Sequence, residues 1–460
     1  MPDFSVILGT PEVRKIVQEG ALERAFHDAL FPNMLFRADA VPMPWPAGVG
    51  DTYIASAPGL IPPVMAPLTP GRDPEPVSYP MEQWEAQVQQ YASTIDTHMP
   101  TSIVAIVDLF MRNAHQLGMQ AAQTMNRIVR NKMYNAAESG WTVANGAGVA
   151  STSLTVKNIA GFTRARSASG SKVRFDTVSS SNPLSITVGG TAASVIACTP
   201  TNTGSEVGPG VLTLASGISW SDRDYVKAID ATELVRVGGG NSVGSIGTTD
   251  LPGLADIRSA VAIFRRNNAP VHPDGHFHAH LDPDSEAMIL GDPELQRLMT
   301  GVPDHFTYQE FALGRMLGVI FLRNNECPIP QTVYPYDGTT FSVNDNFGGE
   351  LYSDGTISGT PIHRILLSAM GGIYEYRMDM SGLLTEAGMV GRSGDVHVVN
   401  NGVDITADGV QLIVRAPLNR LQDQVSTSWK FMGDWPCRTD ACTGGPGRYK
   451  RFSLIQHGQA

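Results

Sequence analysis

A long stretch of the chain has the periodicity of a helix. Between residues 100 and 140, apolar residues recur three and four positions apart, as they do on one face of a helix. The apolar positions are Ile103, Ile106, Val107, Phe110, Ala114, Leu117, Ala121, Met125, Ile128 and Val129. About 36 residues that each rise 1.5 Å predict a helix of roughly 54 Å, which is longer than a small domain is wide. We expect this helix to be the spine of the fold.

The residues before this helix have the periodicity of strands. Apolar residues alternate with polar ones in segment 81–94, at Trp84, Ala86, Val88 and Tyr91. A second strand-like segment covers 50–56, and the residues between the two are rich in proline, which removes ladder hydrogen bonds. We predict a long hairpin with a proline-rich tip. Because such a hairpin is only marginally stable alone, we expect it to lie on a partner surface; the alternative is a disordered linker.

The start of the chain shows a weaker helical pattern. Apolar residues at Val13, Ile16, Val17, Leu22 and Phe26 are spaced as on one helical face, but they are too few to form a core. We therefore predict an amphipathic N-terminal arm that packs on another surface.

Residues 141–240 have a different composition from the rest of the chain. Ser, Thr and Gly dominate, and short β-branched runs recur between turn signals. The runs are SLTVKNI, KVRFDTV, LSITVGG, ASVIACT and GVLTLAS. This pattern predicts a small β barrel or sandwich inserted into the host domain.

Composition and charge limit the classes of function. With 460 residues, the chain is expected to form two or three domains. A net charge of −11 disfavours a surface that grips phosphate backbones. The four cysteines are too few and too scattered for a disulfide framework, so we expect reduced thiols. Because the start lacks a signal-peptide pattern and no apolar run reaches about 20 residues, we expect a soluble cytosolic product without a membrane span.

One segment resembles a zinc site. The run HPDGHFHAHLDPDSE places His276, His278 and His280 on one face of a strand, and His272 lies across a turn from them. Three imidazoles favour metal binding and, with it, a metal-dependent hydrolase. However, alternate residues of a flat strand spread over about 13 Å, so the three cannot all reach one ion.

Asp282, the nearest candidate acid, has another predicted role. It precedes Pro283, and this pair is typical of the N-cap and first position of a helix. We therefore favour a half-exposed strand face at a subunit contact over a metal site, and expect protonation near pH 6 to weaken assembly by bringing like charges together. Cys437 and Cys442 lack a second pair, and the chain has no GxSxG motif. We expect no enzyme activity, metal or cofactor.

Five segments, in chain order, resemble the major capsid proteins of tailed bacteriophages, which have the Hong Kong 97 type fold. The first two are YASTIDTHMPTS, which leads into the spine helix, and LGMQAAQTMNRIVRNKMYNAA within it. The others are GHFHAHLDPDSEAMILGDPELQRL, ALGRMLGVIFLRNNECP, and the closing pair SWKFMGDWPCRTDA and GRYKRFSLIQHG.

The resemblance implies an α+β fold of defined parts. These are an N-terminal arm (1–38), an extended hairpin or E-loop (39–98), a peripheral domain with the spine helix (99–140, 241–284 and 405–460) and an axial domain (285–404). The β-rich insertion (141–240) departs from the minimal pattern. Its role and orientation are open.

The resemblance also implies a function. It implies a structural subunit of the virion that is made in the host cytoplasm. The subunit is expected to form pentamers and hexamers of an icosahedral head. This head encloses double-stranded DNA without sequence-specific DNA binding. A portal and a scaffolding protein are implied as partners. The resemblance leaves open whether a decoration protein is a further partner. The alternatives are an encapsulin-like compartment, the metal-dependent hydrolase and, last, a secreted adhesin. The candidate contact residues between subunits are Val13, Ile16, Val17, Phe26, Tyr53, Ile54, Pro62, Pro63, Arg72 and Trp84.

Overall fold

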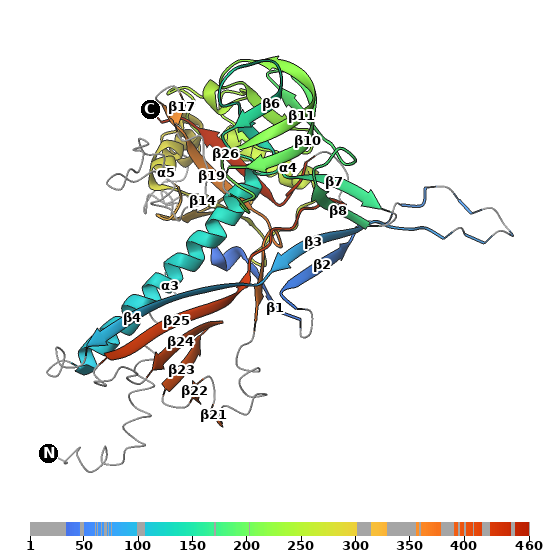
Figure 1. Ribbon diagram of the computed structural model, residues 1–460. Helices are drawn as coiled ribbons and strands as arrows, with labels where there is room; N and C mark the ends of the chain where they lie inside the picture. The colour runs from blue at the N-terminus through green and yellow to red at the C-terminus, as the bar shows by residue number, and fades with distance from the viewer. Residues whose placement is uncertain are drawn as a thin grey trace, which may run out of the picture.

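The fold combines one long helix with several β-sheets (Figure 1). The computed structural model describes residues 34–46, 50–98, 106–169, 172–300, 314–328, 356–378, 391–415 and 424–459, with gaps at 60, 62, 66, 69, 70, 72, 75, 202, 358, 359, 394, 395, 400, 401, 408 and 443–446. The expected arm helix, with Val13, Ile16, Val17 and Phe26, lies outside the described residues, as do Pro62 and Arg72.

The predicted spine helix is confirmed. Helix α3 (Ile106–Ala137) runs through the molecule and packs its apolar face into the largest core (Figure 1). Met125, Val129 and Met133 on this face are fully buried. They share a core with residues from strands β25 and β26, which belong to two different sheets. The helix thus joins the two sheets of the host domain.

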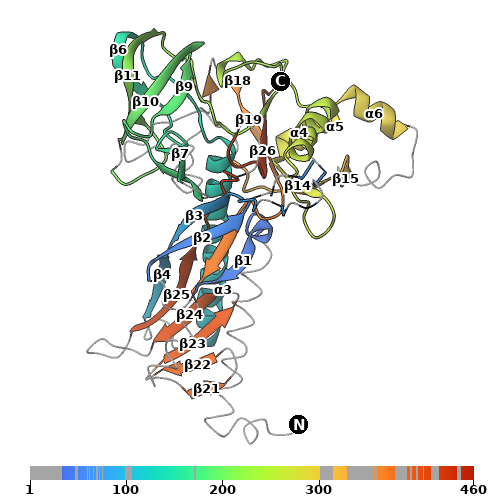
Figure 2. The same ribbon diagram turned by 90° about the vertical axis from the view of Figure 1, so that its right-hand side faces the viewer.

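The first of these sheets lies along α3 in the elongated part of the molecule (Figure 2). Its strand order is β1-β20-β25-β24-β23-β22-β21, with β4 paired to β25. The strands are β1 (Val41–Pro44), β4 (Gln89–His98), β20 (Tyr374–Arg377), β21 (Gly391–Ser393), β22 (Val396–Val399), β23 (Gly402–Ala407), β24 (Val410–Arg415) and β25 (Gln424–Asp434). Trp429 and Phe431 on β25 fill the space beneath α3. The short 3-10 helix η1 (Arg37–Asp39) precedes β1.

The second sheet carries the helices of the upper part of the molecule (Figure 2). Its order is β13-β26-β19-β14-β16-β15. The strands are β13 (Val235–Arg236), β14 (Phe277–Leu281), β15 (Arg315–Met316), β16 (Val319–Arg323), β19 (His363–Ser368) and β26 (Phe452–His457). The helices are η3 (Val243–Ser245), α4 (Leu254–Arg266), α5 (Pro283–Leu290) and α6 (Pro293–Thr300). Every residue of β19 and β26 is buried, because these central strands have α4 on one side and α3 on the other. Strands β17 (Thr356–Ile357) and β18 (Thr360–Pro361) form a separate pair.

Residues 141–228 form a β unit with its own core. Its six-stranded sheet has the order β5-β12-β9-β10-β11-β6. The strands are β5 (Trp141–Val143), β6 (Gly148–Val156), β9 (Leu184–Val188), β10 (Thr191–Pro200), β11 (Gly210–Trp220) and β12 (Tyr225–Ala228). Two further strands, β7 (Arg164–Ser169) and β8 (Lys172–Thr177), do not belong to this sheet. They pair with each other, and β8 also pairs with a strand of the hairpin.

The sheets cut across the domain boundaries expected from the sequence. Strand β26, assigned to the peripheral range 405–460, pairs with β19 from the axial range 285–404. Strand β20 of that axial range pairs with β25, next to α3. The division into a peripheral domain (99–140, 241–284 and 405–460) and an axial domain (285–404) stays a prediction.

All four cysteines are free. Within the described ranges, no helix has both the length and the apolar character that a membrane span requires.

Candidate functional site

The predicted hairpin is confirmed, and its root is firmly attached to the rest of the molecule. Strands β2 (Thr52–Pro58) and β3 (Met81–Gln87) pair along their full length. Residues on alternate positions of β3 face inward, and Trp84 among them stacks on Tyr374 with ring centroids 5.6 Å apart. On its other edge β3 pairs with β8, so the root is part of a four-stranded sheet, β2-β3-β8-β7.

A buried carboxylate holds the root to the closing segment. Glu82 on β3 is fully buried. Its side chain accepts hydrogen bonds from Arg438 Nε (3.1 Å), Thr439 Oγ1 (2.8 Å) and the main-chain nitrogen of Ala441 (3.3 Å). Because a buried charge is costly unless it is paired and hydrogen-bonded, these contacts fix β3 in place. This pairing could not be predicted from the sequence, since Glu82 and Arg438 are 356 residues apart.

The hairpin tip, residues 59–80, is in the opposite situation. It extends away from the body of the molecule (Figure 1), and every described residue from Ile61 to Tyr79 is exposed. The tip nevertheless carries large apolar side chains. Their exposed fractions are 60% for Ile61, 83% for Val64, 88% for Met65, 61% for Leu68, 55% for Val77 and 41% for Tyr79. Clustered exposed apolar side chains mark interaction surfaces on folded proteins.

The predicted contact residues of the hairpin fall into two groups. Ile54 and Pro63 are exposed, and Tyr53 is half-buried between Trp45 and Tyr376. Trp84 is buried within the subunit, so little of its side chain is left for a neighbour. Contact of Tyr53, Ile54 and Pro63 with another copy stays a prediction.

The histidine strand is β14, with His276 directly before it, and His276 and His278 are partly exposed. His280 is fully buried, and the His278 side chain is 17% exposed. Both donate to Asp39 of η1, from His278 Nδ1 to Oδ1 (2.6 Å) and from His280 Nε2 to Oδ2 (2.9 Å). His276 lies apart from them, with its Nδ1 bonded to the main-chain oxygen of Asp274 (2.8 Å). The three strand histidines therefore do not converge on one ion.

The charges around His278 bear on the expected pH effect. Burial opposes a charge on His278, but hydrogen bonds and attraction from Asp39 and Asp274 outweigh it and raise the pKa of His278 to about 9. Burial acts against Asp39 as well, yet His280 and His278 hold the pKa of Asp39 well below its ordinary value. His278 is thus already charged at pH 6, and its charge is paired with carboxylates. The expected repulsion between like charges near pH 6 does not apply to it.

Asp282 has the capping role predicted for it and a second role as well. It accepts a hydrogen bond from Ser285 N (3.1 Å) at the start of α5, with Pro283 in the first turn. Its carboxylate also accepts from Ser285 Oγ and from His363 Nδ1 (2.9 Å), and Ser285 Oγ lies 2.8 Å from His457 Nε2. All four side chains are buried. We therefore assign Ser285 and His457 to the anchoring of α5 and not to a nucleophilic pair.

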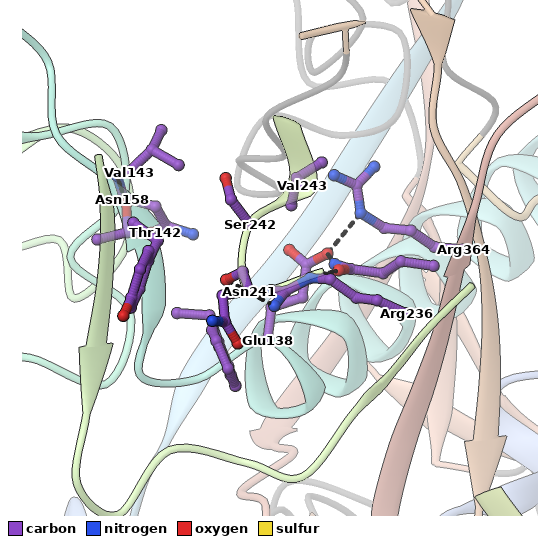
Figure 3. Close-up of a pocket in the computed structure, with 12 residues that line it drawn as sticks. Glu138, Thr142, Val143, Asn158, Arg236, Asn241, Ser242, Val243 and Arg364 are labelled. Atoms are coloured by element: carbon purple, nitrogen blue, oxygen red, sulfur yellow. Dashed lines mark hydrogen bonds and ion pairs between the residues drawn. The ribbon is translucent and has the colours of Figure 1, made fainter. Parts of the chain in front are cut away.

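A polar pocket lies where α3 ends, between the second sheet and the β unit (Figure 3). Glu138, at the end of α3, accepts hydrogen bonds from Arg364 Nε (2.5 Å) and Gln456 Nε2 (3.3 Å). Arg236 donates to Gln456 Oε1 (2.9 Å) and stacks over Trp141 of the β unit. The residues of this network line the pocket and connect the β unit to the spine helix.

No family model matches the sequence, and no curated protein does either.

Solved structures do show a similar fold. The capsid of cyanophage P-SCSP1u has 11% sequence identity and a TM-score of 0.47, with 93% of this chain and 89% of that chain covered. The head of Helicobacter pylori bacteriophage KHP40 has 6% identity and a TM-score of 0.48, with 90% and 88% covered. The SrpI encapsulin from Synechococcus elongatus has 10% identity and a TM-score of 0.39, with 93% and 87% covered. The chain is thus similar in trace to a phage capsid, a phage head and an encapsulin.

Proposed function

We propose that the chain is the major capsid protein of a tailed phage, a structural subunit that associates with copies of itself. The observation that carries this proposal is the contrast within the hairpin. Its root is fixed by strand pairing and by the buried Glu82, whereas its tip presents large apolar side chains to solvent. Exposed apolar area is stabilised by burial at roughly 25 cal/mol per Å². A rigid arm that ends in such a surface is suited to reaching a neighbouring molecule.

The hairpin is proposed to join copies of the chain into a closed ring. A tip whose exposed apolar side chains bind a different part of the next copy makes a heterologous contact. Contacts of this kind generate rings when the rotation closes. On this basis, and on the resemblance of the sequence, we propose pentamers and hexamers in an icosahedral head.

The charge of the chain is compatible with the proposed contents of the head. A net charge of −11 repels polyphosphate, so a wall built from such subunits can enclose double-stranded DNA without binding it tightly. We propose no sequence-specific contact with DNA. The proposal includes a portal and a scaffolding protein as partners, synthesis in the host cytoplasm and residence in the virion.

The β unit is proposed as an insertion into the minimal capsid fold. It begins directly after α3 and has a core of its own, and the chain then returns to the second sheet at β13. Its strands β7 and β8 extend the hairpin sheet, and Arg164 of β7 lies 3.6 Å from Glu85 of β3. We propose that the insertion braces the hairpin root.

The test is to purify the full chain after expression, with and without a co-expressed scaffolding protein, and to image it by negative stain. Hollow particles of uniform size support the proposal. A compact monomer at every concentration and salt concentration would overturn it. The contents separate the two kinds of shell, because nuclease-resistant DNA in native particles supports the phage head, whereas a co-purifying enzyme cargo would identify an encapsulin-like compartment.

A further inference from the structure

Three segments of the chain bring metal-binding side chains together beside β14. Asp39 comes from η1, His272 and Asp274 come from the loop before β14, and His278 lies on β14 itself. One ligand atom each of Asp39, His272 and His278 lies within 4.8 Å of the other two. This group differs from the three strand histidines, because it contains neither His276 nor His280.

The hydrogen bonds around Asp39 and His278 leave one atom of each facing the other. Oδ2 of Asp39 accepts hydrogen bonds from His280 Nε2 (2.9 Å) and from Ser368 Oγ (2.5 Å). Nε2 of His278 donates to Oδ2 of Asp274 (2.7 Å). The remaining atoms, Oδ1 of Asp39 and Nδ1 of His278, are 2.6 Å apart.

This pattern is the one found around protein-bound metals. A histidine that binds a metal through one nitrogen usually donates its other N–H to a carboxylate, and a carboxylate that binds a metal is itself hydrogen-bonded. Asp274 supplies the first of these outer contacts, and His280 with Ser368 supplies the second. These outer contacts orient two potential ligands toward a common point.

His272 provides a third ligand at the same point. Its side chain is buried, and its ring lies parallel to the ring of His278 with centroids 3.9 Å apart. Its Nε2 is 3.4 Å from Ser368 Oγ, so this nitrogen lies near the oxygen that supports Asp39. Because the lone pairs of an imidazole lie in its plane, metal binding turns His272 out of the parallel stack.

We propose that Asp39, His272 and His278 bind a divalent transition-metal ion of the zinc class. Two imidazoles and one carboxylate form a donor set that suits zinc. The ion takes the place of the proton between His278 Nδ1 and Asp39 Oδ1, and that proton is released to solvent. The ion joins η1 to the second sheet. The role is structural, and it is independent of the proposed self-association.

The test is a titration of the full chain with zinc chloride after treatment with a chelator. We expect about one zinc per chain by calorimetry, release of protons in buffers of different ionisation enthalpy, and a rise in melting temperature. Cobalt(II) at the same site is expected to give the visible absorption of a metal with nitrogen and oxygen ligands. His272→Gln and His278→Gln are expected to abolish this binding, and Asp274→Asn to weaken it about 10-fold to 100-fold.

His276→Gln is the matched control, because His276 is a neighbouring histidine whose ring bonds to a main-chain oxygen. It is expected to bind zinc as the parent does. The proposal is overturned if the parent binds no stoichiometric zinc, or if His276→Gln and His278→Gln lose binding equally. Should the His278 variant fail to fold by circular dichroism, the titration of the parent decides alone.

Discussion

Buried charges in the molecule are held by close, paired contacts. Arg37 of η1 donates to both carboxylate oxygens of Glu375 on β20, with Nε to Oε2 at 2.8 Å and Nη2 to Oε1 at 2.6 Å. The side chains are 4% and 3% exposed. Two parallel bonds of this kind fix geometry as well as charge. The pair attaches the segment before β1 to the sheet that lies along α3.

Replacing Arg37 tests the contribution of this pair to stability. Arg37→Met leaves Glu375 buried with fewer positive partners, and we expect it to lower the free energy of unfolding by about 3–5 kcal/mol. Urea denaturation followed by tryptophan fluorescence measures the change. The control is Arg223→Met, because Arg223 and Asp222 are both 58% exposed and 3.8 Å apart, a pair expected to contribute less than about 1 kcal/mol. Equal losses in the two variants would contradict the account.

His363 gives a pH dependence with a definite sign. Its Nδ1 donates to Asp282 (2.9 Å) and its Nε2 to Gln459 Oε1 (3.3 Å). Burial acts to lower the pKa of His363, but its bond and attraction to Asp282 outweigh burial and raise this pKa above 6.5. The charged form therefore stabilises the fold fully below pH 6.5, and this stabilisation is lost as the pH rises through the pKa of the folded state.

His363→Gln checks this sign. Each unit by which the pKa is raised contributes about 1.4 kcal/mol. We expect the difference in unfolding free energy between the parent and His363→Gln to be largest at pH 6 and smaller at pH 9. Denaturation curves at several pH values measure it. A difference that grows with pH would show that His363 is neutral in the folded protein.

For single residues, roles that depend on near neighbours in the chain were predictable from the sequence. Contacts with residues far away in the chain were not. The N-cap role of Asp282 followed from its position before Pro283, since capping involves residues only a few positions apart. The partner of His278 and His280 did not, because Asp39 is 239 residues from His278 along the chain. A single sequence shows that histidines alternate on a strand, but not which carboxylate the fold brings to them.

The hairpin is the element on which the proposed function depends. Trp84 anchors it, because this side chain is 8% exposed and lies against Tyr374 and Arg438. Ile54 on the paired strand is 53% exposed. Trp84 therefore attaches the hairpin to the rest of the molecule, whereas Ile54 lies on the exposed face of the hairpin.

Trp84→Ala is expected to loosen the root of the hairpin. Removing a buried aromatic side chain costs about 3–5 kcal/mol, and we expect faster amide exchange in β2 and β3 with little change in the core of the β unit. Hydrogen exchange read by mass spectrometry measures both regions. Ile54→Ala, the control, is expected to change the free energy of unfolding by less than about 0.5 kcal/mol. The anchoring role fails if Trp84→Ala leaves exchange in β3 unchanged.

The helices and strands themselves were more predictable from the sequence than the way in which they pack and pair. The helical periodicity of α3 and the alternation in β3 are local, and the structure confirms both elements. The strand pairings were not predictable: β26, at the end of the chain, pairs with β19, and β20 pairs with β1 and β25. Such pairings depend on strands far apart in the chain, and each strand alone is compatible with several neighbours.

At the scale of the whole molecule, α3 joins two sheets while the hairpin tip extends beyond both (Figure 1). Sequence patterns predicted that the tip would need a partner surface, because a proline-rich loop between two strands has no core of its own. The structure adds which side chains are exposed. The central claim is that these apolar side chains are covered by another copy of the chain.

The most direct test is the assembly of a tip variant, followed by sedimentation velocity and negative-stain imaging. Val64→Ser, Met65→Ser and Leu68→Ser together remove apolar surface that is 61% to 88% exposed. The control is Val149→Ser, at an 86% exposed position on the β unit. We predict that the parent and the control form large hollow particles, and that the triple variant stays small with an unchanged circular dichroism spectrum. Particles of the triple variant equal to those of the parent would contradict this prediction.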